Sequence, residues 1–448
     1  MSARFRLWFP FVCGASLTVA AGVPPAFAQQ AEPDRASTSG RLAQASRDRG
    51  DGETRPTGPC WEAHPCLQIG RILVADFRAT FQHDWWRSDA PFDEDTEDIR
   101  VREIARERIG FSLKLFERVD VRMERELADT DEPWRDRYVD VRGVDALRLR
   151  AGWFRLPFST EGLSEAADMP LALHAQSATL LAPGRDRGVM LHGSLLDRRV
   201  AYEVGRFEHD GRQTVNTAAG RVHGETTIAW RVTGRPWRPR PSGRGELVAR
   251  VAYTESEIPE GLPWLTARTA LDATYFSTNV FVNGAERRVG AEVSWTSQPC
   301  SASYEYLRLA DDRLGESVED TDLSPIQGEG WFVTGRCVVY GDRRETGGPR
   351  PRTLLPSRGL GFIELAGRFE HLTFGSRATG DEPATSQRAD VIPGNGSRIA
   401  TAGVNWHINR WVRVQWNAVR EALTNPATGP VPGRSHFWNR VFRVQFLL

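Results

Sequence analysis

From Ile72 to the C-terminus, apolar and polar residues alternate within segments of about ten residues, and turn-forming residues separate these segments. Successive side chains of a β-strand point to opposite faces, so a period of two predicts strands that each have one apolar face. One such segment is the stretch in which Val412, Val414 and Trp416 alternate with Arg413, Gln415 and Asn417. After residue 28, no run approaches the roughly 18 apolar residues that a membrane-spanning helix needs.

The alternating segments number sixteen, and the connections between them are short and long in turn. Tight turns are predicted near Arg118, Asp145, Arg198, Pro299 and Asn409. An even number of strands, with short turns at one end and long loops at the other, is the layout of a bacterial outer-membrane barrel. The predicted fold class is therefore all-β, a sixteen-stranded antiparallel transmembrane β-barrel. Its strands are expected at 72–86, 99–116, 119–127, 136–142, 146–156, 188–196, 200–207, 221–234, 246–254, 287–296, 301–309, 330–340, 359–374, 398–407, 411–421 and 437–447.

The N-terminus has the features of a secretory signal peptide. Arg4 and Arg6 precede a mostly apolar stretch at 7–26, and Ala26-Phe27-Ala28 forms a cleavage site of the A-x-A type. We therefore expect residues 1–28 to be removed and the mature chain to begin at Gln29.

Residues 29–59 are rich in Ala, Ser, Gly, Arg, Asp and Pro and show no apolar period, which predicts disorder. The expected organisation is a signal peptide at 1–28, an N-terminal periplasmic segment at 29–66 and a porin barrel at 67–448.

Four cysteines follow the signal segment, namely Cys60, Cys66, Cys300 and Cys337. An even number in an exported protein favours disulfides. Cys60 and Cys66 are close in sequence, and Cys300 and Cys337 fall on strands expected to be neighbours. His64 beside the first pair permits a metal site as the alternative, but we favour two disulfides and predict no metal and no cofactor.

Basic and acidic residues balance at 58 each, which gives no indication of nucleic-acid binding. Lys114 is the only lysine, and a genome of high GC content also produces such a preference for arginine. A charge facing lipid at mid-membrane costs about 2–4 kcal/mol, so arginines between apolar positions should face the lumen. We expect anion-binding, pore-lining roles for Lys114, Arg108, Arg122, Arg148, Arg150, Arg185 and Arg187.

Four sets of segments, in this order along the chain, resemble the phosphate-selective porin O and P family. They are GWFRLPFSTE at 152–161 with PGRDRG at 183–188; SYEYLR at 303–308; GWFVTG at 330–335 with LGFIEL at 360–365 and GRFE at 367–370; and GVNW at 403–406 with VFRVQFLL at 441–448. The resemblance implies a sixteen-stranded barrel that assembles as a homotrimer. It also implies a third extracellular loop, at about 157–187, that folds inward and constricts the pore.

Two features depart from the family pattern. Phosphate-selective members carry lysines on and beside the constriction loop, whereas residues 158–183 contain no lysine and hold Glu161, Glu165 and Asp168. The chain also ends Phe446-Leu447-Leu448, where an outer-membrane barrel usually ends on an aromatic residue.

The sequence therefore predicts an outer-membrane porin that catalyses no reaction, is surrounded by outer-membrane lipid, and passes small solutes with a preference for small anions. Three alternatives remain open at this stage. They are a general porin for small polar solutes, a plugged barrel that does not conduct, and a secreted soluble β-rich enzyme or carbohydrate-binding protein.

Overall fold

The structure is a computed structural model. It describes residues 57–61, 64–89, 101–129, 133–211, 214–217, 220–223, 225–237, 245–263, 265–270, 272–277, 279–341, 361–376, 386–409, 411–431 and 433–448. The predictions for the signal peptide and for residues 29–56 lie outside these ranges. The described part contains no helix that is long and apolar enough to cross a membrane.

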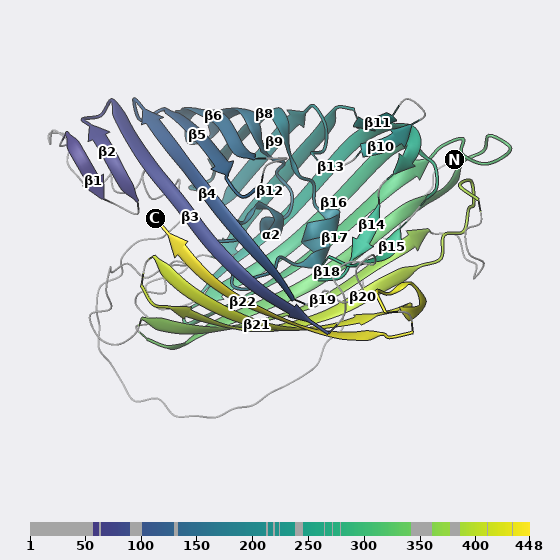
Figure 1. Cartoon of the computed structure of the whole chain (residues 1–448). Helices are drawn as coiled ribbons and strands as arrows, with labels where there is room; N and C mark the ends of the chain where they lie inside the picture. Colours follow the sequence, from purple (N-terminus) through teal and green to yellow (C-terminus); the bar gives the residue numbers. More distant parts are fainter. Residues whose placement is uncertain are drawn as a thin grey trace. The chain divides into compact units, whose positions relative to one another are not determined.

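Sixteen antiparallel strands form a closed barrel, in which each strand pairs with the next one along the wall. The last strand, β22 (His436–Leu447), pairs with the first, β3 (Leu73–Ser88), and this seam closes the wall (Figure 1). The strands between them are β4 (Val101–Leu115), β5 (Val119–Glu126), β6 (Trp134–Val144), β7 (Leu147–Arg155), β8 (Arg185–Leu195), β9 (Val200–Phe207), β12 (Thr227–Trp237), β13 (Glu246–Pro263), β16 (Val282–Ser297), β17 (Cys300–Arg313), β18 (Leu323–Tyr340), β19 (Phe362–Ser376), β20 (Asn395–His407) and β21 (Val412–Leu423).

The fold class predicted from the alternating pattern is confirmed, and side-chain exposure follows the same period. In β22, for example, Phe442, Val444 and Phe446 are exposed, whereas Arg443 and Gln445 are buried. The exposed set forms an apolar outer face, which also includes Trp85, Leu149, Trp230, Val251, Val293 and Leu365. Because hydrocarbon cannot solvate open backbone groups, such a face suits a bilayer only when the sheet is closed, as it is here.

The strands end at tight turns where the sequence predicts them. Phe116 and Glu117, between β4 and β5, have φ of 51° and 58°, and Leu196 and Asp197, between β8 and β9, have φ of 51° and 52°. These left-handed conformations reverse the chain within a few residues. The opposite ends of the strands carry the long loops, so the barrel has a short-turn end and a long-loop end.

Several strands and hairpins extend beyond their predicted limits. Strands β13, β16 and β18 reach further toward the long-loop end than the alternating pattern indicates. Two hairpins also form within loops: β10 (Thr214–Thr217) with β11 (Gly220–His223), and β14 (Thr266–Arg268) with β15 (Thr274–Ser277). The β7–β8 loop contains two short helices, α2 (Thr160–Leu163) and α3 (Gln176–Leu181), and a 3-10 turn, η2 (Pro426–Thr428), lies between β21 and β22.

An N-terminal hairpin extends the wall at the short-turn end. Strand β1 (Gly58–Trp61) pairs with β2 (Pro65–Ile69), and β2 pairs with the beginning of β3, from Ile69↔Leu73 to Cys66↔Asp76. Strand β22 stops at Leu447↔Thr80 on β3. These strands begin before Leu67, which is ahead of the start of the ordered region that composition indicates.

Both predicted disulfides are present. Cys60 and Cys66 lie opposite each other in the β1–β2 hairpin, with Cα atoms 4.8 Å apart. Cys300 and Cys337 lie opposite each other on β17 and β18, with Cα atoms 4.1 Å apart. The cysteines therefore bridge neighbouring strands, and the metal alternative for the first pair is not needed.

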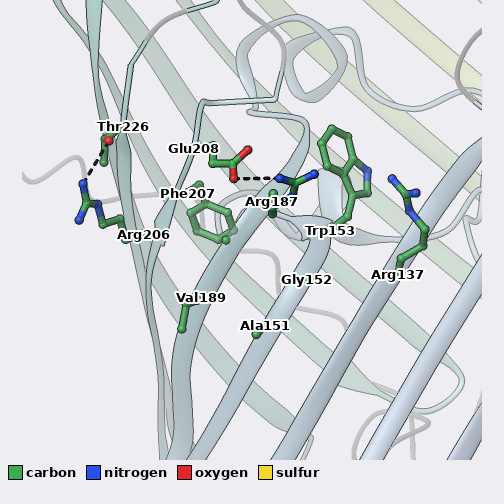
Figure 2. A pocket seen from close by; sticks show the side chains of 11 residues that line it. Arg137, Ala151, Gly152, Trp153, Arg187, Val189, Arg206, Phe207, Glu208 and Thr226 are labelled. Carbon is green, nitrogen blue, oxygen red and sulfur yellow. Dashed lines mark hydrogen bonds and ion pairs between the residues drawn. The ribbon is translucent and has the colours of Figure 1, made fainter.

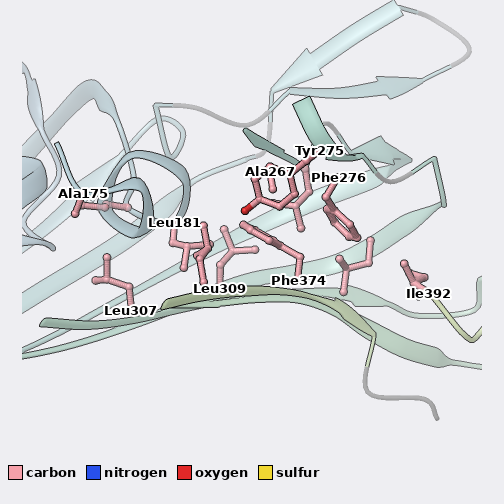
Figure 3. Packing of buried hydrophobic residues seen from close by; sticks show 14 of the residues in the cluster. Ala175, Leu181, Ala267, Tyr275, Phe276, Leu307, Leu309, Phe374 and Ile392 are labelled. Atoms are coloured by element: carbon pink, nitrogen blue, oxygen red, sulfur yellow. The ribbon is translucent and has the colours of Figure 1, made fainter. Parts of the chain in front are cut away.

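An apolar cluster packs against the buried face of β13 and β16–β19. Leu181 of α3 and Tyr275 and Phe276 of β15 pack with Leu307 of β17 and Phe374 of β19 (Figure 3). The rings of Phe276 and Phe374 stack at 5.4 Å. This sector therefore resembles the core of a soluble protein, because loop segments supply its second layer.

Candidate pore constriction

The β7–β8 loop, residues 156–184, is held by polar side chains from the buried face of β19–β22. The N–H of Ala172 donates to Asn417 Oδ1 at 2.6 Å, and the N–H of Gln176 donates to Glu370 Oε2 at 2.6 Å. Four backbone carbonyl oxygens of the loop accept hydrogen bonds from side chains of these strands. The pairs, donor first, are Arg368 with Leu173 O, Asn405 with Pro170 O, Arg413 with Met169 O and Gln445 with Ala167 O.

These contacts satisfy the backbone groups that the loop buries. A buried N–H or C=O without a partner costs about 1–3 kcal/mol, so an irregular segment away from water needs side-chain partners. Asn405, Asn417 and Gln445 are fully buried. In the sequence they follow the alternation of ordinary lumen residues, and no local signal marks them as partners of a loop more than 200 residues away.

The start of the loop is shaped by its own hydrogen bonds. Ser159 caps α2, because its Oγ accepts the N–H of Gly162 at 2.9 Å. Arg155, at the end of β7, donates to the carbonyl oxygens of Gly162 and Ser164. The loop is therefore fastened at its first turn as well as along β19–β22.

Two of the three predicted loop acids are bound by arginine. Glu161 accepts from Arg368 at 3.0 Å and from the N–H of Ala175 at 3.0 Å. Burial raises the pKa of Glu161, while Arg368 and the Ala175 N–H oppose this shift. Glu165 lies 2.5 Å from Arg122.

Glu165 is ionised at physiological pH. Burial opposes its ionisation, but the nearby charges of Arg122 and Arg108 outweigh burial and lower the pKa of Glu165 to about 2. The third acid, Asp168, lies in the same loop, and its N–H donates to Glu165 O at 2.9 Å.

His174, also in this loop, was not singled out in the sequence. Burial lowers the pKa of His174 to about 3, and the positive charges of Arg155 and Arg368 contribute in the same direction. The imidazole is therefore neutral at physiological pH, and its surroundings are electropositive.

The buried-side face of β4–β7 carries more basic than acidic side chains, and we call this face the basic wall. Its basic members are Arg106, Arg108, Lys114, Arg122, Arg142, Arg148, Arg150 and Arg155, and its acidic members are Asp120, Glu124, Glu126, Asp136 and Asp140. The basic side chains are half-buried, whereas Arg368, Arg413 and Arg443 on β19–β22 are buried. The basic wall is therefore the part of the described interior best suited to contact a charged solute.

The structure brings most of the predicted cations together on or beside this wall. Arg122 contacts Glu124 and Glu165, and Arg108 contacts Glu126 at 3.5 Å. Lys114 lies 3.9 Å from Asp120. Arg150 binds Asp140 at 2.9 Å with its guanidinium carbon 4.3 Å from the centre of the Tyr138 ring, and Arg185 binds Asp136 at 2.8 Å.

Arg142 and Arg148 lie directly opposite each other on β6 and β7. Arg148 is a predicted pore-lining residue, whereas the sequence analysis did not propose Arg142. The alternation that places Asp140 inward also places Arg142 inward, so this residue could have been found from the same pattern. Two cations facing each other across strands repel unless water or an anion lies between them.

Arg187 lies elsewhere. Its side chain is 70% exposed, pairs with Glu208 at 3.3 Å and lies on the outer face of the barrel beside Trp153. The prediction that Arg187 lines the pore is therefore corrected. The direction of its side chain follows the strand alternation of β8, which the sequence analysis treated as the end of a loop.

Within the described ranges, Asp186, Glu208 and His209 place three possible metal ligands within 4.8 Å of one another. His209 pairs with Asp186 at 3.2 Å, and Glu208 pairs with Arg187. These groups already have protein partners, and we assign no metal to them.

Comparison with known protein families finds that residues 76–436 match the model of phosphate-selective porin O and P. This match extends from β3 into β22 and includes the basic wall and the β7–β8 loop. The chain belongs to this porin family. The family resemblance inferred from four sets of short segments is thereby confirmed.

Solved structures with the same barrel fold are distant in sequence. OmpT, an outer membrane protein of Vibrio cholerae, aligns with a TM-score of 0.54 and 11% identity over 86% of this chain and 99% of its own. An anion-selective porin from Comamonas acidovorans aligns with a TM-score of 0.53 and 9% identity over 84% of this chain and 100% of its own. The trimer form of OmpT aligns with a TM-score of 0.51 and 12% identity over 84% of this chain and 100% of its own.

Comparison with curated protein sequences finds no match. The solved structures therefore bear on the fold of this porin, and the family match bears on its class.

Proposed function

We propose that this porin forms a water-filled channel in the bacterial outer membrane, passes small solutes by diffusion, favours anions and catalyses no reaction. The observation that carries the proposal is the basic wall, where arginines outnumber carboxylates on the face opposite the apolar outer surface. Positive groups along a narrow pore raise the local concentration of anions, and several weak sites allow the anion to leave again.

The β7–β8 loop is the constriction in this proposal. Its backbone is hydrogen-bonded to side chains from the face of β19–β22 that is opposite the exposed apolar residues. A loop in that position narrows the lumen and faces the basic wall. The ion pair between Arg122 of the wall and Glu165 of the loop supports this placement.

Phosphate is included among the anions because guanidinium groups bind phosphate through two parallel hydrogen bonds. The family's lysines are absent from the loop, so arginines of the basic wall take their place. Export by a signal peptide cleaved after Ala28 and assembly as a homotrimer belong to the same proposal. The trimer form of the distant OmpT structure supports the assembly.

The test is the reversal potential of the purified, full-length mature porin in a planar bilayer under a KCl gradient. We expect the sign of an anion-selective channel, and a cation-selective sign would contradict the proposal. Phosphate at micromolar to millimolar concentration should then block part of the chloride current, whereas sulfate should block less.

Two variants test whether the basic wall sets the sign of the reversal potential. Replacing Arg142 and Arg148 together by Gln should shift the reversal potential toward zero, because both positive charges leave the lumen. The matched control replaces Arg398 and Arg420, which are exposed on β20 and β21, by Gln. The control should leave the reversal potential unchanged, and equal shifts in both variants would show that the wall does not set selectivity.

One observation favours a second candidate, a barrel that does not conduct. The apolar cluster around Leu181, Tyr275 and Phe374 fills part of the interior in the described ranges. A barrel that is closed throughout would insert into the bilayer without current steps. Single-channel recording distinguishes the two candidates directly.

A further inference from the structure

Three arginines lie on the outer face of neighbouring strands near the long-loop end. Arg137 of β6, Arg187 of β8 and Arg206 of β9 are all exposed. We call them the outer arginine cluster. They point away from the interior, so the channel proposed above makes no use of them.

The cluster lies at the border of the apolar outer face. Arg137 is opposite Trp153, and Trp153 is opposite Arg187, so these side chains form one row across β6–β8. The next row toward the short-turn end is Val139, Ala151 and Val189, and the row after that is Val141, Leu149 and Leu191. Charged and Trp side chains directly above apolar rows are typical of the level where lipid headgroups meet hydrocarbon.

A hollow of about 660 Å³ lies within this border. Its lining includes Arg137, Trp153 and Arg187 on one row and Ala151, Val189 and Arg206 on the next (Figure 2). Gly152 and Gly188, which also line the hollow, are paired across β7 and β8 and add no side-chain atoms to it. Gly152 has φ of 138°, and a Cβ on it would lie 2.3 Å from Arg137 O, so a larger residue could not replace it without moving the strands.

Contacts around the hollow orient the cations. The guanidinium of Arg137 lies 5.2 Å from the centre of the Trp134 ring and 5.8 Å from that of Trp153. Arg187 pairs with Glu208 at 3.3 Å, and Arg206 donates to Thr226 at 3.4 Å. Each arginine is held on one side and retains further N–H donors, because a guanidinium has five.

Arg187 is the member of the outer arginine cluster that is paired with a carboxylate in the described ranges. Its partner is Glu208, and Arg125 on β5 adds a fourth exposed cation beside the cluster. On β16, by comparison, the exposed Arg287 has two carboxylates beside it, Asp312 at 2.8 Å and Glu255 at 3.6 Å. The hollow, and not exposed positive charge alone, therefore distinguishes this sector from β20–β22, where Arg398, Arg420 and Arg440 are also exposed.

We propose that the outer arginine cluster and its hollow bind the phosphate-bearing headgroup of a membrane lipid. Arg137, Arg187 and Arg206 bind the phosphate oxygens, and an acyl chain lies over Ala151 and Val189. Charge complementarity selects the phosphate, and the apolar rows below it select a lipid over a free anion. The inference rests on the membrane location in the proposed function, but it does not depend on conduction.

The experiment counts lipids on the full-length mature porin, refolded in a zwitterionic detergent, by native mass spectrometry. The probe is short-chain phosphatidic acid, and the comparison is phosphatidylcholine of the same chain length, whose quaternary ammonium group brings the net charge of its headgroup to zero. We expect retention of phosphatidic acid, and we expect the triple variant R137Q/R187Q/R206Q to weaken its binding by about tenfold or more. The matched control R398Q/R420Q/R440Q removes three exposed arginines from β20–β22.

The outcomes separate the sources of phosphate and the possible occupants. Equal losses in the two triple variants would overturn the proposal, since they would reflect general surface charge. Displacement of phosphatidic acid by an equal concentration of inorganic phosphate would also overturn it in favour of a free-anion site. A loss of trimer mass confined to R137Q/R187Q/R206Q would assign the surface to a second copy of the chain.

Single-channel conductance of the same triple variant keeps the two proposals apart. Lost lipid binding with unchanged conductance supports the lipid site and leaves the channel as it is. Unchanged lipid binding overturns the lipid site whatever the channel does.

Discussion

The inward-facing polar side chains of this porin form two groups, which differ in the groups that they contact. On the basic wall, Arg122 and Arg150 have carboxylates or aromatic rings beside them, yet they remain partly accessible. On β19–β22, the polar side chains of Asn417 and Gln445 are fully buried and form hydrogen bonds with the loop backbone. An inward-facing position in a strand can therefore either remain accessible to solute or hold the β7–β8 loop. Which of the two it does depends on whether the loop packs against it.

The pair of Glu165 and Arg122 gives a prediction at this scale. Replacing Glu165 by Gln removes a negative charge that faces the basic wall and leaves Arg122 less neutralised. We expect the reversal potential to move further in the anion-selective direction. The control is Glu257→Gln, which removes a carboxylate exposed on the outer side of β13, and it should have no effect. A shift toward cation selectivity in Glu165→Gln would contradict the assignment.

The same residue predicts a pH dependence. Its pKa is lowered to about 2, from the ordinary value near 4.3. A lowered pKa means that the Glu165–Arg122 pair contributes full stability above that ordinary value and loses it as the pH falls toward 2. The difference in reversal potential between the Glu165→Gln variant and the unchanged porin should therefore be constant from about pH 5 to 8.

At the scale of elements, the barrel strands could be predicted from their period, and the loop segments that pack against their buried faces could not. Strand β7 was expected at 146–156 and spans Leu147–Arg155, and β21 was expected at 411–421 and spans Val412–Leu423. Alternation is a local property, so a short window reveals it. Helix α3 and the β14–β15 hairpin were missed because they are short and are stabilised by contacts with strands far away in sequence.

The candidate site also has one part that local alternation predicts and one part that depends on contacts between residues far apart in sequence. The inward direction of Lys114, Arg122, Arg148 and Arg150 follows from alternation alone. The neutralisation of Glu161 by Arg368 does not, because the two residues are 207 positions apart. Within a well-predicted strand, sequence reasoning therefore predicts which charges face inward, but at a misplaced strand start, as for Arg187, it does not, and it does not show which charges form ion pairs.

Arg368 gives the prediction for the loop as an element. It donates to Glu370, to Glu161 and to Leu173 O, and all of these groups lie in the buried sector. Arg368→Ala leaves two carboxylates without their cation, and breaking such a buried pair costs roughly 3–5 kcal/mol. We expect a lower free energy of unfolding in urea, measured by tryptophan fluorescence in lipid vesicles, and noisier single-channel currents as the loop detaches.

The matched control for this prediction is Arg398→Ala, on the outer face of the neighbouring strand β20. It should change the free energy of unfolding by less than about 0.5 kcal/mol, as most exposed substitutions do. Quiet channels and normal stability in Arg368→Ala would mean that the loop is held mainly by its other contacts.

For the whole molecule, the seam between the first and last barrel strands, β3 and β22, is the contact that closes the barrel. Strand β22 pairs with β3 along its length, and the terminal Leu448 exchanges two backbone hydrogen bonds with Ala79 at 2.8 and 3.1 Å. Phe446 is the aromatic residue nearest the end of β22, and the centre of its ring lies 6.4 Å from that of Phe81. The rings of Phe442 and Trp85 have their centres 5.6 Å apart. The unusual C-terminal Leu-Leu is thus accommodated within the seam.

Phe446 gives the prediction for closure. Phe446→Ala removes a ring that spans the seam on the outer face, and an aromatic pair contributes about 0.5–1.5 kcal/mol beyond its burial. We expect a smaller fraction of compact, fast-migrating barrel in unheated gel samples after refolding into vesicles. Val404→Ala, also exposed but away from the seam, is the control and should refold normally. Equal yields from both variants would argue against a special role for the seam ring.

The apolar cluster behind the β7–β8 loop has a consequence for any ion that crosses this barrel. In the proposed channel, the packing of Leu181, Tyr275 and Phe374 excludes water and solute from one side, so the passage is off-centre and runs along the arginines of β4–β7. An anion that passes through is then attracted toward the basic wall, and it stays close to that wall along its path. Widening the packed side would add cross-section without adding charge, so it would increase the current while weakening the choice between ions.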